Sequence, residues 1–307
     1  MTLPEWVRVL DLSREFCRFR SFRFKVRALL VTFIMNSSRF PKLAIAALLI
    51  IALLWGYNWT QMKIAVQYAP PFTFAALRTL CGGLSLFAAL VALRKPLRPQ
   101  EIPLTFWLGV FQTAGVYGFA SWALVSGGAG KTSVLVYTMP FWTLLLAWQF
   151  LGERVRGLQW VAIAVAFSGL LIILDPFNLT GSIFSSMLAV LAGLSWAAGS
   201  IVAKKLQQKT KVDLLSLTAW QTLFGSFPLL IISAFTHTSA IQWTPAFIGA
   251  LVYNILPGTA IPMLLWLYVL TRLSAGMSGL GMLLTPVLGV VFAALQLGEQ
   301  PQSSELV

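Results

Sequence analysis

Arg78 lies well inside a long apolar stretch of the sequence. A charged side chain at the centre of a bilayer costs about 2.5–3.5 kcal/mol on insertion scales, so such residues normally face a helix bundle or a cavity. Its guanidinium could then be the counter-charge for an anionic or zwitterionic ligand. The alternative is that the side chain extends to the membrane surface, because Pro71 begins this stretch only seven residues earlier.

Two prolines, Pro140 and Pro286, each stand near the middle of a predicted membrane helix. A proline removes a backbone hydrogen bond and leaves a carbonyl unpaired, and breaks at corresponding positions of two halves are typical of a central binding site. The segment 254–258, Asn-Ile-Leu-Pro-Gly, predicts another discontinuity. The alternative is that these prolines only kink packed helices, because Pro and Gly are common in membrane helices.

Polar and aromatic side chains within the apolar stretches could bind an amphipathic or aromatic metabolite. With Arg78, Pro140 and Pro286, the candidate substrate-binding residues are Asn58, Trp59, Gln112, Tyr117, Tyr137, Trp196, Gln221, Tyr253 and Asn254. Asn58, Gln112 and Tyr253 are the strongest of these, because their polar atoms need partners in hydrocarbon. For any one residue the alternative is an interfacial aromatic belt or a hydrogen bond between helices.

The sequence offers no recognisable catalytic or metal-binding pattern. It has no CxxC, no HExxH and no P-loop, and its one histidine, His237, falls in a predicted loop. We therefore expect no enzyme activity, no cofactor and no metal. No acidic residue lies in the middle of a span, which favours a facilitator or a potential-sensitive carrier over a proton relay. Glu153 and Glu299 end two of the apolar stretches, where they are expected to cap helices or pair with neighbours.

The composition predicts an all-α integral membrane protein with the lipid bilayer as its surroundings. Of 307 residues, 58% are hydrophobic and 10% charged, whereas soluble domains carry about 25% charged residues. A spanning helix needs about 20 apolar residues. Nine stretches qualify: 43–64, 71–93, 103–125, 131–151, 157–174, 183–203, 213–235, 245–270 and 276–297.

The basic residues predict the orientation. The formal net charge of +13 would suggest nucleic acid in a soluble protein, but here 19 basic residues fall in alternate connections and two, Lys63 and Lys131, in the others. The positive-inside rule then gives a cytoplasmic N-terminus in a multi-pass protein of the cell (inner) membrane, and no nucleic-acid partner. Residues 1–42 form a basic leader that is either a cytoplasmic amphipathic tail or an extension upstream of a true start at Met35.

The two halves of the chain resemble each other. Residues 129–153 align without gaps onto 275–299 at an offset of 146, so that Pro140 matches Pro286. Ala76–Gly82 also aligns with Ala219–Gly225, which pairs Arg78 with Gln221. Because the first copy contains five helices, an odd number, the second copy must lie inverted in the membrane. Inverted repeats are common in secondary transporters, which work by alternating access.

Several short motifs together resemble the EamA family of the drug/metabolite transporter superfamily. They are Trp55–Trp59, Pro70-Pro71 before Ala76-Leu77-Arg78, Pro140 with Gly152-Glu153, and Pro286 with Gly298-Glu299. The resemblance covers about residues 43–300. It implies ten helices in two inverted repeats, with helices 1, 3, 4, 6, 8 and 9 around a central cavity, and the export of small metabolites, often amino acids or related compounds.

The sequence departs from this pattern after Glu299, where only eight residues follow and a tenth helix needs about 20. We therefore expect three regions: the leader 1–42, a first repeat 43–175 and a shortened second repeat 183–307. The expected function is secondary transport, with export as the direction, of a small molecule such as an amino acid. The alternative is an inactive truncated carrier or a non-transporting membrane scaffold.

Overall fold

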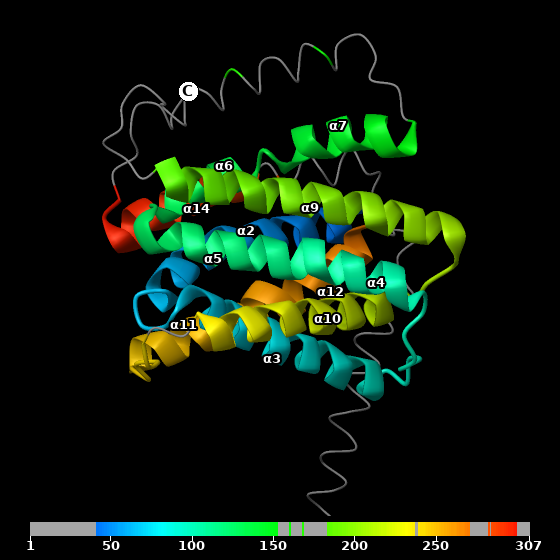
Figure 1. Cartoon of the computed structure of the whole chain (residues 1–307), viewed down its shortest axis with the longest axis horizontal. Coiled ribbons are helices and arrows are strands. Elements are labelled where there is room, and N and C mark those ends of the chain that lie inside the picture. The colour runs from blue at the N-terminus through cyan, green and yellow to red at the C-terminus, as the bar shows by residue number, and fades with distance from the viewer. Residues whose placement is uncertain are drawn as a thin grey trace, which may run out of the picture. The chain divides into compact units, whose positions relative to one another are not determined.

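The computed structural model of the chain describes residues 41–152, 160, 168, 183–236, 239–270, 282 and 284–299. All contacts reported below lie within the unit Ala44–Val307. In this part of the chain the regular elements are all helices (Figure 1): α2 (Pro41–Ala65), α3 (Pro71–Ala92), α4 (Ile102–Gly109), η2 (Val110–Gly115), α5 (Val116–Ser126), α6 (Ala129–Val136), α7 (Met139–Leu151), α9 (Ile183–Lys209), α10 (Leu214–Phe235), α11 (Pro245–Ile255), η3 (Leu256–Ala260), α12 (Ile261–Leu270) and α14 (Leu284–Leu297).

Seven helical segments are long and apolar enough to cross a membrane. They are 42–65, 71–92, 102–126, 129–151, 183–206, 214–235 and 245–266, and α14 is a shorter apolar helix. Each matches a predicted span, with ends that differ by a few residues. The predicted span 157–174 and the first part of 276–297 fall almost wholly outside the described residues. The total of nine spans therefore stays a prediction.

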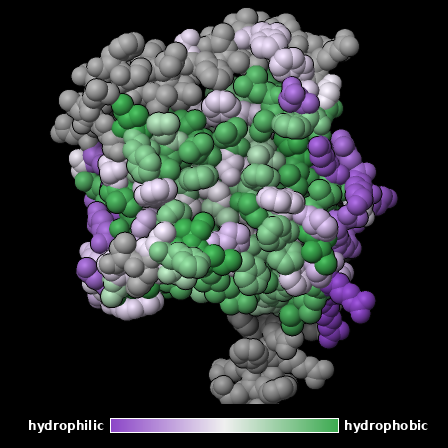
Figure 2. Space-filling view, viewed as in Figure 1, coloured by the Kyte–Doolittle hydropathy of each residue, from purple (hydrophilic) through white to green (hydrophobic). Residues whose placement is uncertain are grey.

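Large apolar side chains cover much of the outside of the bundle. Phe235 is 87% exposed, Leu295 79% and Val91 59%. In Figure 2 hydrophobic side chains occupy the middle of the view, and hydrophilic ones gather at its two edges. Such continuous apolar surface is unfavourable in water and suits contact with lipid.

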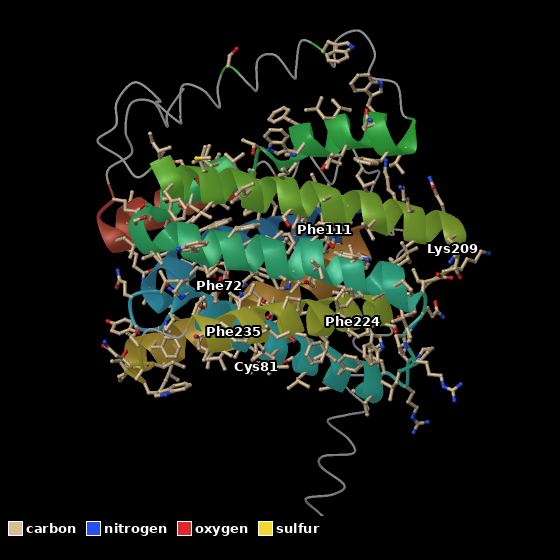
Figure 3. The ribbon with its side chains drawn as sticks, in the orientation of Figure 1. Phe72, Cys81, Phe111, Lys209, Phe224 and Phe235 are labelled. Carbon is tan, nitrogen blue, oxygen red and sulfur yellow. The ribbon has the colours of Figure 1, made fainter. Side chains whose placement is uncertain are left out.

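The basic residues divide unequally between the two ends of the bundle. At one end of the bundle α3 and α9 finish and α4 and α10 begin, and we call it the Lys209 end. This end carries Arg94, Lys95, Arg98, Lys204, Lys205, Lys209 and Lys211. Figure 3 labels Lys209 there. The opposite end, called the Lys63 end, carries Lys63 at the close of α2 and Lys131 at the start of α6.

Helices from the two sequence halves pack against one another. α10 lies against α3 and α4, α9 against α5 and α7, and α14 against α6. Glycines allow α4 and α10 to approach closely. A Cβ atom added to Gly109 would lie 2.4 Å from the Gln221 carbonyl oxygen, and one added to Gly225 would lie 2.4 Å from the Gly109 carbonyl oxygen. Contact between backbones is what small residues permit in membrane bundles.

Three helix interruptions lie inside these spans, and the sequence predicts two of them. The fourth span breaks between α6 and α7, with Pro140 in the first turn of α7. Pro257 lies in the π-helical turn η3 between α11 and α12. The π-helical turn η2 contains no proline and was not predicted. There Ser195 of α9 donates a hydrogen bond to the Phe111 carbonyl at 2.8 Å, which compensates a carbonyl in the widened turn.

Pro286 lies in the first turn of α14 as the structure describes it. Whether the ninth predicted span is broken before Pro286 falls outside the described residues. The ends of α7 and α14 are alike, since Gly152 and Gly298 follow them with φ of +67° and +66°. This left-handed conformation is the usual helix terminator at glycine, and the two glycines are 146 positions apart.

Candidate functional site

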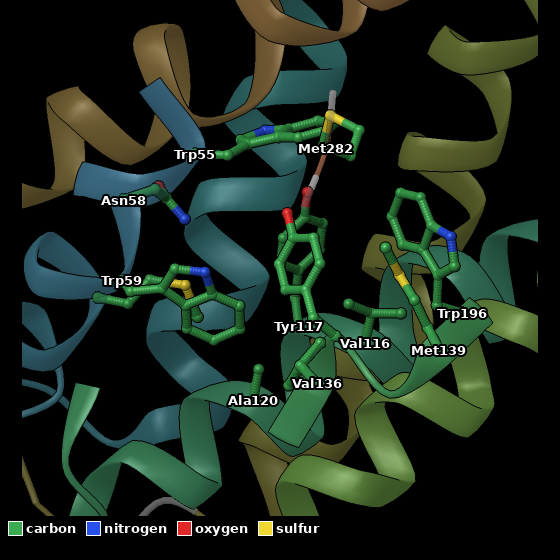
Figure 4. A pocket seen from close by; sticks show the side chains of 12 residues that line it. Trp55, Asn58, Trp59, Val116, Tyr117, Ala120, Val136, Met139, Trp196 and Met282 are labelled. Atoms are coloured by element: carbon green, nitrogen blue, oxygen red, sulfur yellow. The ribbon is translucent and has the colours of Figure 1, made fainter. Parts of the chain in front are cut away.

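A cavity opens beside the break between α6 and α7 (Figure 4). The empty space at this site, together with the open solvent at its mouth, is about 560 Å³. Residues from α2, α5, the α6–α7 break and α9 line it, together with Met282. They are Trp55, Asn58, Trp59, Met62, Val116, Tyr117, Ala120, Val136, Tyr137, Met139, Trp196 and Met282.

The helical repeat explains which residues of α2 reach the cavity. Trp55, Asn58, Trp59 and Met62 are spaced i, i+3, i+4 and i+7, which places them on one face of a helix. The break between α6 and α7 turns Tyr137 toward the same space as Val136 and Met139. The wall therefore combines one continuous helix face with a segment whose helix is interrupted.

Five of the twelve residues that line the cavity are aromatic. Trp55 and Trp196 meet edge to face, with ring centroids 6.5 Å apart. The Trp55 indole N–H donates to the Gly258 carbonyl at 3.1 Å, which satisfies its polar atom and fixes the ring. Such a wall offers apolar and π surfaces to a ligand and few hydrogen-bonding groups.

Arg78 lies behind the cavity wall, not in it. Its side chain is fully buried, so the alternative that it extends to the membrane surface is wrong. The guanidinium carbon is 4.2 Å from the centre of the Tyr117 ring, which itself lines the cavity. Nη2 donates to the Thr259 hydroxyl at 3.2 Å and to the Gly258 carbonyl at 3.5 Å. One aromatic ring therefore separates a buried positive charge from the cavity.

The hydrogen-bonding capacity of Arg78 is only partly used. Nε and Nη1 are buried and have no hydrogen-bond partner among the described residues. Asn58 shows the same pattern at its Oδ1 atom, although its amide lines the cavity. Buried polar atoms normally find partners. Of these two side chains, Asn58 lines the cavity, and Arg78 lies behind the Tyr117 ring with a charge that no hydrogen bond at Nε or Nη1 offsets.

Five of the candidate residues named from the sequence meet at this cavity. They are Asn58, Trp59, Tyr117, Tyr137 and Trp196, and Arg78 contacts one of them. The candidates did not include the other lining residues, which are Trp55, Met62, Val116, Ala120, Val136, Met139 and Met282. The i+7 spacing from Trp55 could have identified Met62.

The remaining candidates lie elsewhere in the bundle. Gln112 packs on Gly199, since a Cβ atom added to Gly199 would lie 2.7 Å from the Gln112 Cβ atom. Tyr253 donates its hydroxyl to the Leu54 carbonyl at 2.9 Å, and Asn254 donates to the Ala250 carbonyl at 2.8 Å. Gln221 is buried, Pro140 exposed and Pro286 partly buried, and none of the three lines the cavity.

Comparison with known proteins places this arrangement in a family. The EamA-like transporter family matches residues 42–175 and again residues 183–307. The chain belongs to the EamA-like transporter family. Together with the seven apolar helices, this makes it a multi-pass membrane protein of a transporter family. Membership of a family of membrane transporters argues against an enzyme.

Individual relatives cover most of the chain. An uncharacterized transporter, YoaV, of Bacillus subtilis is 30% identical over 256 residues, which are 81% of this chain and 87% of that protein. A probable amino-acid metabolite efflux pump of Salmonella typhimurium is 30% identical over 264 residues, 82% of this chain and 86% of the pump. A solved crystal structure aligns with 86% of this chain and 91% of its own chain, at 19% sequence identity and a TM-score of 0.62. It therefore has the same fold.

Proposed function

We propose that this chain is a secondary transporter that exports small metabolites, such as amino acids or related compounds, across the cytoplasmic membrane by alternating access. The observation that carries the proposal is the aromatic cavity at a broken helix inside an apolar bundle. Similarity to a probable amino-acid metabolite efflux pump supports the substrate class. The excess of basic residues at the Lys209 end supports a cytoplasmic position for that end.

In this proposal Arg78 and Asn58 orient the substrate. The charge of Arg78 lies 4.2 Å behind the Tyr117 ring and has no carboxylate partner among the described residues. It therefore makes that wall of the cavity electropositive and favours an anionic or zwitterionic substrate over a cationic one. Asn58 supplies an amide for hydrogen bonds, and the Trp and Tyr rings contact the apolar part of the substrate.

Transport assays in proteoliposomes test this function. Uptake and efflux of labelled amino acids, and of their amides that lack the carboxylate, would be compared for the parent chain, Arg78→Gln and Arg94→Gln. Arg94 is an arginine at the Lys209 end, outside the helices, and serves as the control. We expect the parent and Arg94→Gln to move amino acids in preference to amides, and Arg78→Gln to lose that preference with at least about a tenfold lower rate, equivalent to 1.4 kcal/mol.

The parent chain decides the proposal. If the folded parent moves no labelled compound above empty liposomes, transport of this substrate class is wrong. The alternative of an inactive carrier or membrane scaffold would then be favoured. Thermal unfolding of Arg78→Gln in detergent shows whether a loss of rate is only a loss of fold.

A further inference from the structure

Two helix ends are capped by opposite charges at the Lys63 end of the bundle. The Lys63 ammonium donates to the carbonyls of Leu124, at 2.7 Å, and Gly127, at 2.8 Å, where α5 ends. The Glu299 carboxylate accepts from the backbone N–H groups of Ala129, at 2.8 Å, and Gly130, at 3.1 Å, where α6 begins. We call these two side chains and the four backbone groups they bind the Lys63–Glu299 junction.

The signs of the two charges match the helix ends that they contact. The last carbonyls of a helix carry partial negative charge and the first N–H groups partial positive charge, and both lack partners within the helix. All four hydrogen bonds are charge-assisted and partly buried, which makes them stronger than neutral ones. The Glu299 charge also acts on Lys63 across the turn. The junction therefore strongly favours the packing seen here.

The junction joins the two sequence halves. Lys63, α5 and α6 belong to the first half, and Glu299 follows α14 in the second. The positive φ of Gly298 turns the chain so that Glu299 reaches back to α6. The fit is close, because a Cβ atom on Gly128 would lie 3.0 Å from the Glu299 Oε2 atom. The carboxylate thus fills a space that only glycine leaves open.

Three walls of the cavity lead directly into the junction. Met62, which lines the cavity, immediately precedes Lys63 in α2. In α5, Ala120 lies one turn before Leu124, and in α6 Val136 lies within two turns of Gly130. The junction therefore lies just beyond the cavity at the Lys63 end.

α14 also covers a cavity residue at this end. A Cβ atom on Gly289 of α14 would lie 2.8 Å from the Ser133 Oγ atom and 3.4 Å from Trp59 Cδ1. Moving α14 away from α6 would expose Trp59, and it would also remove both hydrogen bonds from Glu299. Opening the cavity at the Lys63 end by this movement and keeping the junction are therefore incompatible.

We propose that the Lys63–Glu299 junction keeps the cavity closed at the Lys63 end and that it separates whenever that end opens during transport. This inference rests on the transport function proposed above. Glu299 and Lys63 are positioning residues in it, since neither lines the cavity. Weakening the junction should shift the protein toward the state open at the Lys63 end.

Thiol labelling of two buried reporter positions tests the proposal in detergent micelles, where the reagent reaches both ends of the bundle. In a full-length chain with Cys17→Ser and Cys81→Ser, Ser133→Cys reports separation of α6 from α14, and Thr105→Cys in α4 reports general loosening. Ser133 is 0% and Thr105 1% exposed. We expect Glu299→Gln to raise the labelling rate of Ser133→Cys by a membrane-impermeant maleimide at least about tenfold, with no change at Thr105→Cys. Glu299→Asp, which keeps the charge, should raise it less.

The outcomes separate this proposal from the function on which it rests. An unchanged rate at Ser133→Cys, or an equal rise at both reporters, would overturn the junction proposal even if the parent chain transports. A selective rise at Ser133→Cys supports it even if none of the tested solutes is moved, because labelling does not depend on a substrate. Slower export by Glu299→Gln together with a selective rise in labelling would link the junction to transport.

Discussion

The two ends of the bundle use the same kinds of charged residues in different ways. At the Lys63 end, Lys63 and Glu299 bind backbone groups at helix ends and are partly buried. At the Lys209 end, Lys95 pairs with Asp213 at 2.7 Å and Lys209 with Glu101 at 2.6 Å. There the lysine side chains are 47% and 62% exposed. Charge pairs in contact with water are screened and contribute little, whereas buried charges that satisfy backbone groups are costly to remove.

This contrast indicates that the two ends differ in rigidity. The Glu299 hydrogen bonds and both ion pairs join elements of the first sequence half to elements of the second, whereas Lys63 binds within the first half. The exposed pairs at the Lys209 end can exchange with water at little cost. The caps at the Lys63 end leave unpaired backbone groups when they separate. The Lys63 end therefore has fewer charged residues than the Lys209 end, but its charged residues hold the helices together more firmly.

The largest effect is expected for Lys63→Met. It leaves the Leu124 and Gly127 carbonyls without a partner, and each charged hydrogen bond lost costs about 1.5–3 kcal/mol. Thermal unfolding in detergent should show a clearly lower Tm than for the parent. Lys131→Met removes the other lysine of the same end and should change Tm much less. Equal shifts for both variants would mean that charge count, and not capping, matters there.

A smaller loss is expected for Gly128→Ala. The new methyl group would lie 3.0 Å from Glu299 Oε2, so the carboxylate or the turn must shift, and overpacking costs about 1–3 kcal/mol. Gly249→Ala is the matched control, because nothing lies within 4 Å of its added Cβ and alanine is favoured in helices. Unfolding midpoints of the two variants measure the difference. An unfolding midpoint of Gly128→Ala equal to that of the parent would contradict the close fit of Glu299 against Gly128.

At the other end, Lys209→Met should have little effect. The Lys209–Glu101 pair is largely exposed, and such pairs contribute at most about 1 kcal/mol, less at high salt. Unfolding of the parent and of Lys209→Met at low and high salt should give midpoints that converge as salt rises. A loss as large as that of Lys63→Met would remove the distinction between the two ends.

The smallest expected effect is a pH dependence at Asp213. Burial raises its pKa, but hydrogen bonds from Lys95 and from the Ser216 backbone N–H, with the Lys95 charge, outweigh burial and lower the pKa overall. Because the pKa of Asp213 is lower in the folded than in the unfolded state, its ionised carboxylate stabilises the fold at pH values above the unfolded-state pKa, near 3.9. This contribution is lost as the pH falls through the folded-state pKa. The Tm difference between parent and Asp213→Asn should therefore narrow from about pH 7 to about pH 3. A constant difference would show that Asp213 acts without its charge.

Hydrophobic pattern and proline position were enough to predict much of the fold. Seven spans were predicted to within a few residues, because lipid requires about 20 apolar residues whatever they pack against. The breaks at Pro140 and Pro257 followed from the missing backbone N–H of proline. The π-helical turn η2 could not be predicted, because it depends on Ser195 of another helix reaching the Phe111 carbonyl.

The candidate site divides in the same way. By itself the sequence determined which side chains were available: aromatic and amide groups in the spans, one arginine inside a span, and carboxylates after two glycines. Only the tertiary structure decided which of them meet. It brought Asn58, Trp59, Tyr117, Tyr137 and Trp196 to one cavity and placed Arg78 behind Tyr117. It also joined Glu299 to the start of α6, 170 positions away from Ala129. Helix periodicity fixes the face of a residue relative to its own helix, but the neighbour of that face depends on how the helices pack.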